Sequence, residues 1–202
     1  MIVAGLTGSI AMGKTTVAKM FAALGASVFD ADAAVRAFYR SPGAAAVEAA
    51  FPGVVEGGEV DRAKLSTAAL ADRDALARLE AIVHPEVARL RQAFIERAAA
   101  QGRRVVVVDA PLLFETAGEK AVDLVVVVSA GEKAQRARAL ARPGMSAAKF
   151  EAILARQTPD REKRRLAHCV IDTSGPFERT RAQVAGLLRA IAAAPGRRGD
   201  DA

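Results

Sequence analysis

The strongest constraint on this chain is a short glycine-containing pattern between an apolar run and a helix-like segment. Gly8 to Thr15 reads Gly-Ser-Ile-Ala-Met-Gly-Lys-Thr, directly after Ile2–Leu6 and directly before Thr16–Phe21. A strand that leads into such a turn and then into a helix directs successive N–H groups, and the positive end of the helix dipole, at an anion. The pattern therefore predicts a phosphate-binding loop (P-loop), and the alternative is an ordinary strand–turn–helix corner.

The predicted loop assigns roles to its residues. Lys14 is expected to reach the β- and γ-phosphates of ATP as a catalytic cation, and the Thr15 hydroxyl is expected to ligate Mg²⁺. The expected ATP-binding residues of the loop are Gly8, Ser9, Ile10, Ala11, Met12, Gly13, Lys14, Thr15 and Thr16.

Apolar runs along the chain predict the fold class. Five of them have strand-like length: Ile2–Leu6, Ser27–Phe29, Val105–Val108, Leu124–Val128 and Val170–Ile171. The third and fourth are nearly continuous valine, as expected of strands buried on both faces, and the runs alternate with helical stretches. We therefore predict an α/β fold: a parallel five-stranded sheet of the P-loop type, flanked by helices.

Two helical segments interrupt this core. Ala31–Gly102, about 70 residues, is too long for a usual crossover and is expected to form an acceptor-binding insertion, in which His84-Pro85 begins a helix that runs to about Ala100. Residues 131–165 are expected to form a helical lid with a turn at 142–145. The prediction is a single kinase domain with its core at about 1–30, 103–130 and 166–192, and a flexible tail at 195–202.

Composition limits the cellular setting. Of the 202 residues 51% are hydrophobic, yet no apolar run reaches the roughly 20 residues that span a bilayer, and no basic leader precedes the first strand. The expectation is a cytoplasmic protein without a membrane partner. The single cysteine, Cys169, excludes an internal disulfide and a cysteine-based zinc site.

The formal charge of +6 and the isoelectric point near 10.0 indicate anionic partners. Residues 131–165 hold ten basic and four acidic side chains, so this segment alone accounts for a net +6. No aromatic residues alternate with these arginines, as a base-stacking surface for nucleic acid would require. A compact phosphorylated ligand is therefore favoured over nucleic acid.

Phosphoryl transfer also needs a carboxylate near the attacking hydroxyl, and two positions offer one. Asp32 follows the second predicted strand at the edge where open α/β sheets bind ligands, and we predict that it is the catalytic base. The alternative is that Asp32 only caps the helix over residues 33–39. Asp109 ends the third strand and is expected to hold Mg²⁺ through water, with a polar strand end as the alternative.

Further candidates flank these carboxylates. The segment Pro111, Leu112, Leu113, Phe114 and Glu115 is either core or the wall for an apolar part of the substrate. In the lid, Gln135, Arg138 and Arg142 fall at i, i+3 and i+7, which places all three on one face of a helix. That face would bring both arginines to the ATP phosphates, although surface arginines are more often only solvated.

Several of these motifs occur together and in order, and so the chain resembles the dephospho-CoA kinase family. The matching residues are Gly5–Ile10 with Gly13-Lys14-Thr15, Asp30-Ala31-Asp32, His84-Pro85, Pro111–Glu115, Gln135 with Arg138 and Arg142, Gln157, and Val170-Ile171-Asp172. The resemblance implies transfer of the ATP γ-phosphate to the ribose 3′-hydroxyl of dephospho-CoA. It further implies that Asp32 is the base, that His84 and Pro111–Glu115 border the acceptor, and that Arg138 and Arg142 serve ATP.

Three positions depart from the family pattern. Ala11 stands where glycine is usual, which predicts a negative φ there. Pro143 replaces an aspartate after Arg142, and the run 167–173 lacks the usual aspartate and asparagine, ending in Thr173.

Two other readings stay open from the sequence. One is another small-molecule kinase, acting on a nucleoside or a sugar acid. The other is a regulatory nucleotide-binding ATPase or GTP switch, of which the GTP version requires an Asn-Lys-x-Asp reader that a chain without asparagine cannot form.

Overall fold

The computed structural model describes residues 1–40, 43–69 and 73–194, which form two compact units. The first unit consists of Met1–Phe29 together with the chain from Arg97 onward, and the second of Asp30–Glu96. The expected tail at 195–202 lies outside the described residues. No helix within the described ranges is long and apolar enough to cross a membrane.

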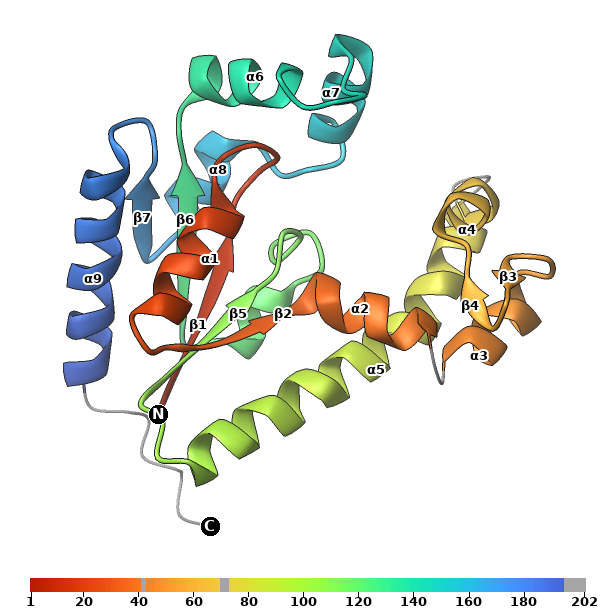
Figure 1. Ribbon diagram of the computed structural model, residues 1–202, viewed down its shortest axis with the longest axis horizontal. Helices are drawn as coiled ribbons and strands as arrows, with labels where there is room; N and C mark the ends of the chain where they lie inside the picture. The colour runs from red at the N-terminus through yellow and green to blue at the C-terminus, as the bar shows by residue number, and fades with distance from the viewer. Residues whose placement is uncertain (41–42, 70–72, 195–202) are drawn as a thin grey trace. The chain divides into compact units, whose positions relative to one another are not determined.

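The first unit is built on a five-stranded sheet (Figure 1). Its strands are β1 (Ile2–Thr7), β2 (Ser27–Asp30), β5 (Val105–Asp109), β6 (Leu124–Ser129) and β7 (Cys169–Asp172). They lie in the order β2-β5-β1-β6-β7, and β1 pairs in parallel with β5 and β6, as β6 does with β7. The predicted fold class is confirmed, and each strand extends one residue beyond its predicted carboxyl end.

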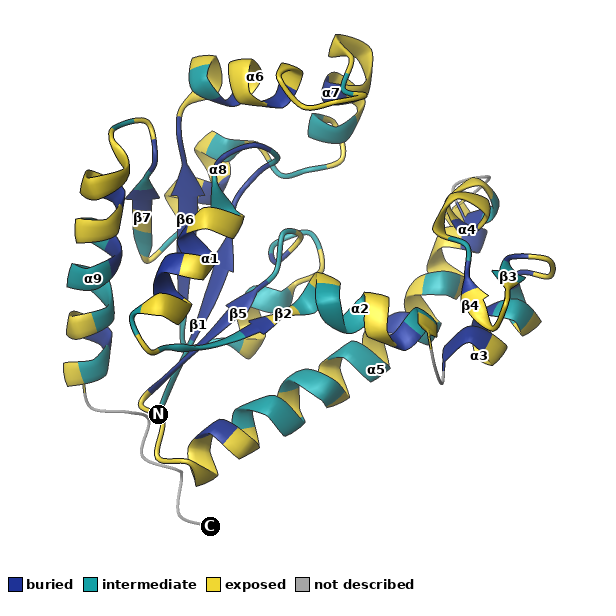
Figure 2. Cartoon of the chain, viewed as in Figure 1, coloured by how far each residue is buried: buried dark blue, intermediate teal, exposed yellow. Residues whose placement is uncertain are grey.

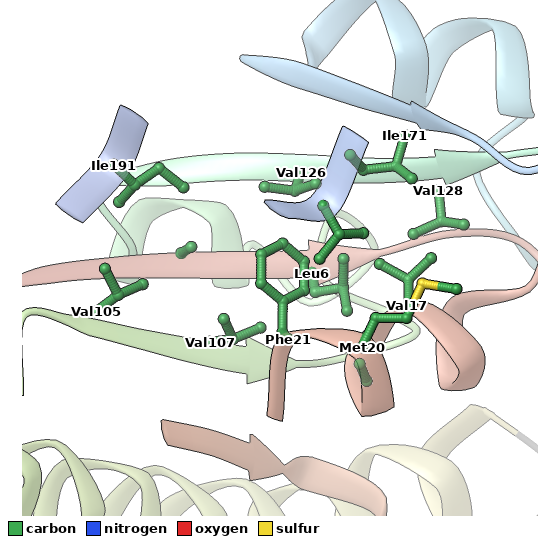
Figure 3. Packing of buried hydrophobic residues seen from close by; sticks show 13 residues of the cluster. Leu6, Val17, Met20, Phe21, Val105, Val107, Val126, Val128, Ile171 and Ile191 are labelled. Carbon is green, nitrogen blue, oxygen red and sulfur yellow. The ribbon is translucent and has the colours of Figure 1, made fainter. Parts of the chain in front are cut away.

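The valine-rich strands are buried on both faces, as Figure 2 shows for β5 and β6. Val126 and Val128 face one side of the sheet, whereas Val125 and Val127 face the other. On the first side α1 (Lys14–Ala23) and α9 (Phe177–Ala193) pack against the sheet, and Figure 3 shows Phe21 among the strand side chains. The carboxyl ends of β1, β5 and β6 are thus fixed by a continuous apolar core.

Between β6 and β7 lie α6 (Glu132–Leu140), α7 (Ala147–Leu154) and α8 (Asp160–Leu166). The predicted turn at 142–145 is present, because Met145 N donates to Arg142 O at 3.2 Å. A short 3₁₀ helix, η1 (Gly118–Ala121), precedes β6.

The second unit contains the predicted helical insertion. Its elements are α2 (Ala31–Arg40), α3 (Gly43–Ala50), the hairpin of β3 (Val55–Glu56) and β4 (Glu59–Val60), α4 (Arg62–Ala69) and most of α5 (Arg73–Ala100). The unit has an apolar cluster of its own, in which Phe38, Val47 and Phe51 are buried. It therefore holds its shape by local packing.

The predicted start of the long helix at His84-Pro85 is wrong. Helix α5 begins at Arg73 and passes through Pro85 without interruption. A proline removes one helical N–H and crowds the preceding turn, but the alanine, leucine and arginine residues on both sides favour the helix strongly. Packing of Val83 in the apolar cluster of this unit holds the helix on the N-terminal side of the proline.

Candidate active site

The loop between β1 and α1 needs glycine at two of its positions, Gly8 and Gly13. A Cβ on Gly8 would lie 2.7 Å from the Val128 carbonyl oxygen, so the chain can pass β6 there only as glycine. Gly13 has a φ of 93° and precedes α1, whose first turn has no side-chain cap. Thr16 N of the first turn already donates to Gly13 O at 3.0 Å, and among the described residues the N–H groups of Lys14 and Thr15 remain for a ligand.

Lys14 and Asp109 form an ion pair beside this loop. Lys14 Nζ lies 2.5 Å from Asp109 Oδ1, and the two side chains are only 13% and 10% exposed. Their meeting follows from the sheet, because Leu6 of β1 and Asp109 of β5 are register partners. The two residues predicted to serve phosphate and metal thus lie side by side.

Side chains from the segment after β6 and from the end of β7 hold the loop. Ile10 N donates to Gln157 Oε1 at 3.0 Å, and Gln135 Nε2 donates to Ile10 O at 2.9 Å. Thr173 Oγ1 donates to Met12 O at 2.7 Å. The loop backbone is therefore held by side chains from two parts of the chain. One of these side chains is Thr173, which departs from the family pattern.

The prediction that Ala11 keeps a negative φ is wrong: its φ is 62°. The left-handed conformation costs a residue with a Cβ about 1–2 kcal/mol. Ala11 is also buried and packs with Ala139 and Phe150. The surrounding contacts, and not the local preference of alanine, decide the conformation at this position.

A cavity of about 330 Å³ opens beside the loop. Its lining residues are Ala11, Gly13, Thr16, Met20, Arg138, Arg142, Thr173, Gly175, Phe177 and Thr180. Arg138 is anchored there, since its Nη2 donates to Thr173 O at 2.7 Å. Phe177 is 56% exposed and offers an apolar ring to a ligand.

The helical face predicted for Gln135, Arg138 and Arg142 is only partly correct. Helix α6 ends at Leu140, so Arg142 lies in the following turn and not on the helix. Gln135 is buried against the loop, whereas Arg138 and Arg142 line the 330 Å³ cavity together. The two arginines thus share one site without sharing a helix.

A larger cavity, of about 740 Å³, has Ser9 and Met12 of the loop in its wall. Its other lining residues come from 131–164 and include Glu132, Glu151 and Asp160 as well as Arg161 and Arg164. Carboxylates would repel a triphosphate, so the smaller cavity, with its arginines and no acid, fits a nucleotide better.

The segment after β5 divides between core and surface. Leu113 is 2% exposed and packs with Val125 and Val127, so it belongs to the core, whereas Leu112 is 44% exposed. Thr7 Oγ1 donates to Pro111 O at 3.2 Å, which holds the segment at the end of β1. Of the two roles open from the sequence, core applies to Leu113, while Leu112 is free to contact a ligand.

Glu115 has a partner that the sequence did not reveal. Lys163 of α8 is fully buried and places its Nζ 2.9 Å from Glu115 Oε1, which also accepts from Thr158 N at 2.7 Å. Burial raises the pKa of the Glu115 carboxyl, but the Lys163 ammonium and hydrogen bonds from backbone N–H groups outweigh burial and lower it. This pair connects the segment after β5 to the segment that returns to β7.

The second unit contains the remaining predicted site residues, Asp32 and His84. Asp30 Oδ1 accepts from Ala33 N at 2.8 Å and so caps α2. Asp32 lies in the first turn, is exposed, and has no hydrogen bond or ion pair with the described residues. The alternative in which Asp32 serves as the cap is therefore wrong, because Asp30 has that role. His84 is exposed on α5.

The oxygen donors beside the loop suit a cation that takes only some of its ligands from the protein. Among the described residues no group of three or more histidine, cysteine or acidic side chains is arranged to hold a metal. Thr15 at the start of α1 and Asp109 at the end of β5 supply a hydroxyl and a carboxylate, both of them hard oxygen donors. Mg²⁺ is typically bound by one or two such ligands, water and phosphate oxygens.

Comparison with known proteins identifies the family of the chain. The family model for dephospho-CoA kinase matches residues 1–178. A relative from Rhodopseudomonas palustris strain HaA2, named dephospho-CoA kinase, is 53% identical over 198 residues, which cover 98% of this chain and 100% of the relative. The crystal structure of TT1252 from Thermus thermophilus has a TM-score of 0.82 at 35% identity and covers 93% of this chain and 97% of its own. A dephospho-CoA kinase structure from Campylobacter jejuni shares the fold, with a TM-score of 0.63 at 19% identity over 94% of this chain and 96% of its own.

Proposed function

This chain belongs to the dephospho-CoA kinase family, and on that premise we propose that it transfers the γ-phosphate of ATP to the ribose 3′-hydroxyl of dephospho-CoA. This reaction is the last step of coenzyme A synthesis. The observation that carries the proposal is the glycine-dependent loop with Lys14 beside Asp109, in a chain of this family.

We propose that ATP binds along the loop of residues 8–16 and in the 330 Å³ cavity. The loop N–H groups and Lys14 would hold the phosphates, while Arg138 and Arg142 add positive charge from the cavity wall. Phe177 would contact the adenine base of ATP. The lack of acidic side chains in this cavity supports the assignment.

We propose that Thr15 and, through water, Asp109 hold Mg²⁺. When bound, the ion would screen the phosphate charges and orient the γ-phosphate. Asp109 also pairs with Lys14, which keeps two nearly buried charges compensated.

We propose that the second unit is the acceptor lobe and that Asp32 is the base. The carboxylate of Asp32 is exposed and has no hydrogen bond or ion pair with the described residues. It can therefore accept a proton from the attacking hydroxyl. His84 and the segment 111–115 would border the acceptor. A cytoplasmic location and the absence of a nucleic-acid partner stay predictions.

The role of Asp32 is tested by two matched substitutions, Asp32→Asn and Asp30→Asn. A general base contributes about 10²- to 10⁴-fold, so Asp32→Asn is expected to lower kcat at least about 100-fold with an unchanged melting temperature. Asp30→Asn makes the same chemical change two residues away, and asparagine still caps α2, so turnover should stay near normal. Near-normal turnover of Asp32→Asn would remove the base assignment.

The acceptor is tested by a substrate screen. ADP release is expected to depend strictly on dephospho-CoA and to yield the 3′-phosphorylated product by mass spectrometry. Turnover with a nucleoside or sugar acid, but not with dephospho-CoA, would refute the proposal. ADP release without any acceptor would instead favour a regulatory ATPase.

A further inference from the structure

Two glutamine side chains bind the backbone of one residue of the phosphate loop, Ile10, one at its N–H and one at its carbonyl. Gln157 accepts from Ile10 N at 3.0 Å, and Gln135 donates to Ile10 O at 2.9 Å. Both glutamines come from the segment between β6 and β7, more than 120 residues from the loop. The next residue along the chain, Ala11, has the left-handed φ of 62°.

We propose that Gln135 and Gln157 are positioning residues that keep the phosphate loop in its ligand-binding form, which Ala11 by itself disfavours. The inference rests on the proposed function only in taking ATP as the nucleotide. Neither glutamine needs to touch the nucleotide in this role, because each acts through the backbone of Ile10.

The backbone fixes the direction of both hydrogen bonds. The amide N–H of Ile10 can only donate and its carbonyl oxygen can only accept, so Gln157 must present its oxygen and Gln135 its nitrogen. These partners therefore decide which terminal atom of each glutamine amide is the oxygen and which is the nitrogen. The two side chains have the same chemistry but opposite roles.

Burial makes the Gln135 contact matter most, since Gln157 is only half-buried. Gln135 is 3% exposed, so its amide has little water to turn to if the Ile10 carbonyl moves away. On the other side of Ala11, Met12 O accepts from Thr173 Oγ1 at 2.7 Å. A strained residue persists when its neighbours are held on both sides, and here residues 10 and 12 are both held.

Packing extends the same connection. The methyl group of Ala11 is buried against Ala139 of α6 and Phe150 of α7, with Ile10 packed on the same cluster. The segment 131–165 is thus attached to the loop by these contacts, while Arg138 and Arg142 of the same segment line the 330 Å³ cavity. The loop and this segment should respond together to a change in either glutamine.

The first experiment measures ATP affinity by calorimetry for Gln135→Ala and Gln157→Ala. Each variant is expected to weaken ATP binding about tenfold, the factor that corresponds to 1.4 kcal/mol, and to raise KM for ATP more than KM for dephospho-CoA. Gln92→Ala, on an exposed face of α5, is the matched control and should bind ATP normally. Unchanged ATP affinity in both test variants would overturn the proposal.

Glutamate substitutions test the direction of each bond. Gln157→Glu keeps an acceptor for Ile10 N, and because both variants add the same negative charge, it should bind ATP at least about threefold more tightly than Gln135→Glu. Gln135→Glu replaces a donor by an acceptor facing the Ile10 carbonyl and should lose at least about tenfold. Equal losses in both variants would contradict the polarity on which the proposal depends, and this comparison stays valid if one alanine variant fails to fold.

The strain at Ala11 gives an independent test. Glycine adopts a positive φ at no steric cost, so Ala11→Gly should recover at least about threefold of the ATP affinity that Gln157→Ala loses. If Ala11→Gly changes affinity equally with and without Gln157, the glutamine does not act through the loop conformation. ATP binding is measured without acceptor, so these outcomes are separate from whether dephospho-CoA is the acceptor.

Discussion

At the scale of single residues, glycine positions show which parts of the loop are fixed by sterics. Gly13 and Gly25 have nearly equal φ values, 93° and 90°. A Cβ on Gly13 would lie 3.3 Å from Thr173 Oγ1, whereas a Cβ on Gly25 would meet nothing within 4 Å. The two glycines thus share the same left-handed backbone conformation but differ in their surroundings.

This difference predicts the outcome of alanine at each position. Both Gly13→Ala and Gly25→Ala are expected to cost about 1–2 kcal/mol of stability through the left-handed backbone. Gly13→Ala should also weaken ATP binding at least about tenfold, because the added methyl group crowds Thr173 and displaces the loop. Thermal melts and calorimetry separate the two effects, and equal ATP affinities in the two variants would argue against the loop as the phosphate site.

At the scale of elements, the Glu115–Lys163 pair connects the segment after β5 to α8. Lys163 is fully buried, and the 2.9 Å contact with Glu115 compensates its charge. Removal of one member of a buried pair costs about 3–5 kcal/mol, because the other charge is left without compensation. The pair therefore holds the two segments together whatever Glu115 does toward a ligand.

We predict that Glu115→Ala lowers the free energy of unfolding by about 3–5 kcal/mol. The double variant Glu115→Ala with Lys163→Met should be more stable than Glu115→Ala alone, because no buried ammonium remains. Urea unfolding of the two variants and of Lys163→Met gives the coupling energy directly. Simple additivity of the two single substitutions would show that the pair contributes nothing.

The same carboxylate predicts a dependence of stability on pH. The folded pKa of Glu115 lies below its ordinary value of 4.5, so its ionised form contributes stability above about that pH. This contribution is lost as the pH falls from 4.5 through the folded pKa. The melting temperature of the parent protein should therefore fall more steeply on acidification than that of Glu115→Gln; parallel curves would contradict the assignment.

At the scale of the whole molecule, two compact units each have their own apolar core. The proposed ATP site lies wholly in the first unit, and Asp32 and His84 belong to the second. This division predicts that each substrate protects a different part of the chain.

Hydrogen exchange tests the division. A non-hydrolysable ATP analogue is expected to slow exchange in residues 8–16 and 131–165, and dephospho-CoA to slow it within residues 31–96. The CoA product is a useful control, since it carries the same pantetheine arm. Protection by dephospho-CoA confined to the first unit would refute the proposal that the second unit is the acceptor lobe.

Short stretches of the sequence predict much of the fold. Runs of valine predict buried parallel strands because such strands have apolar neighbours on both faces, and Gly8 to Thr15 predicts the loop because its glycines serve a local turn. The start of α5 was misplaced because Pro85 is a weak helix terminator when both flanks favour the helix. Arg142 was placed on a helix because a spacing of seven residues does not show where the helix ends.

The sequence by itself determined the phosphate loop, the five strands and the family, since each depends on residues adjacent in the chain or on an ordered set of motifs. Only the tertiary structure decided the partners of Lys14, Glu115 and Ile10, because each partner lies 43 or more residues away and no local pattern encodes that contact. It also decided the conformation of Ala11. Long-range packing there overrides the backbone preference of alanine, which is all that the local sequence expresses.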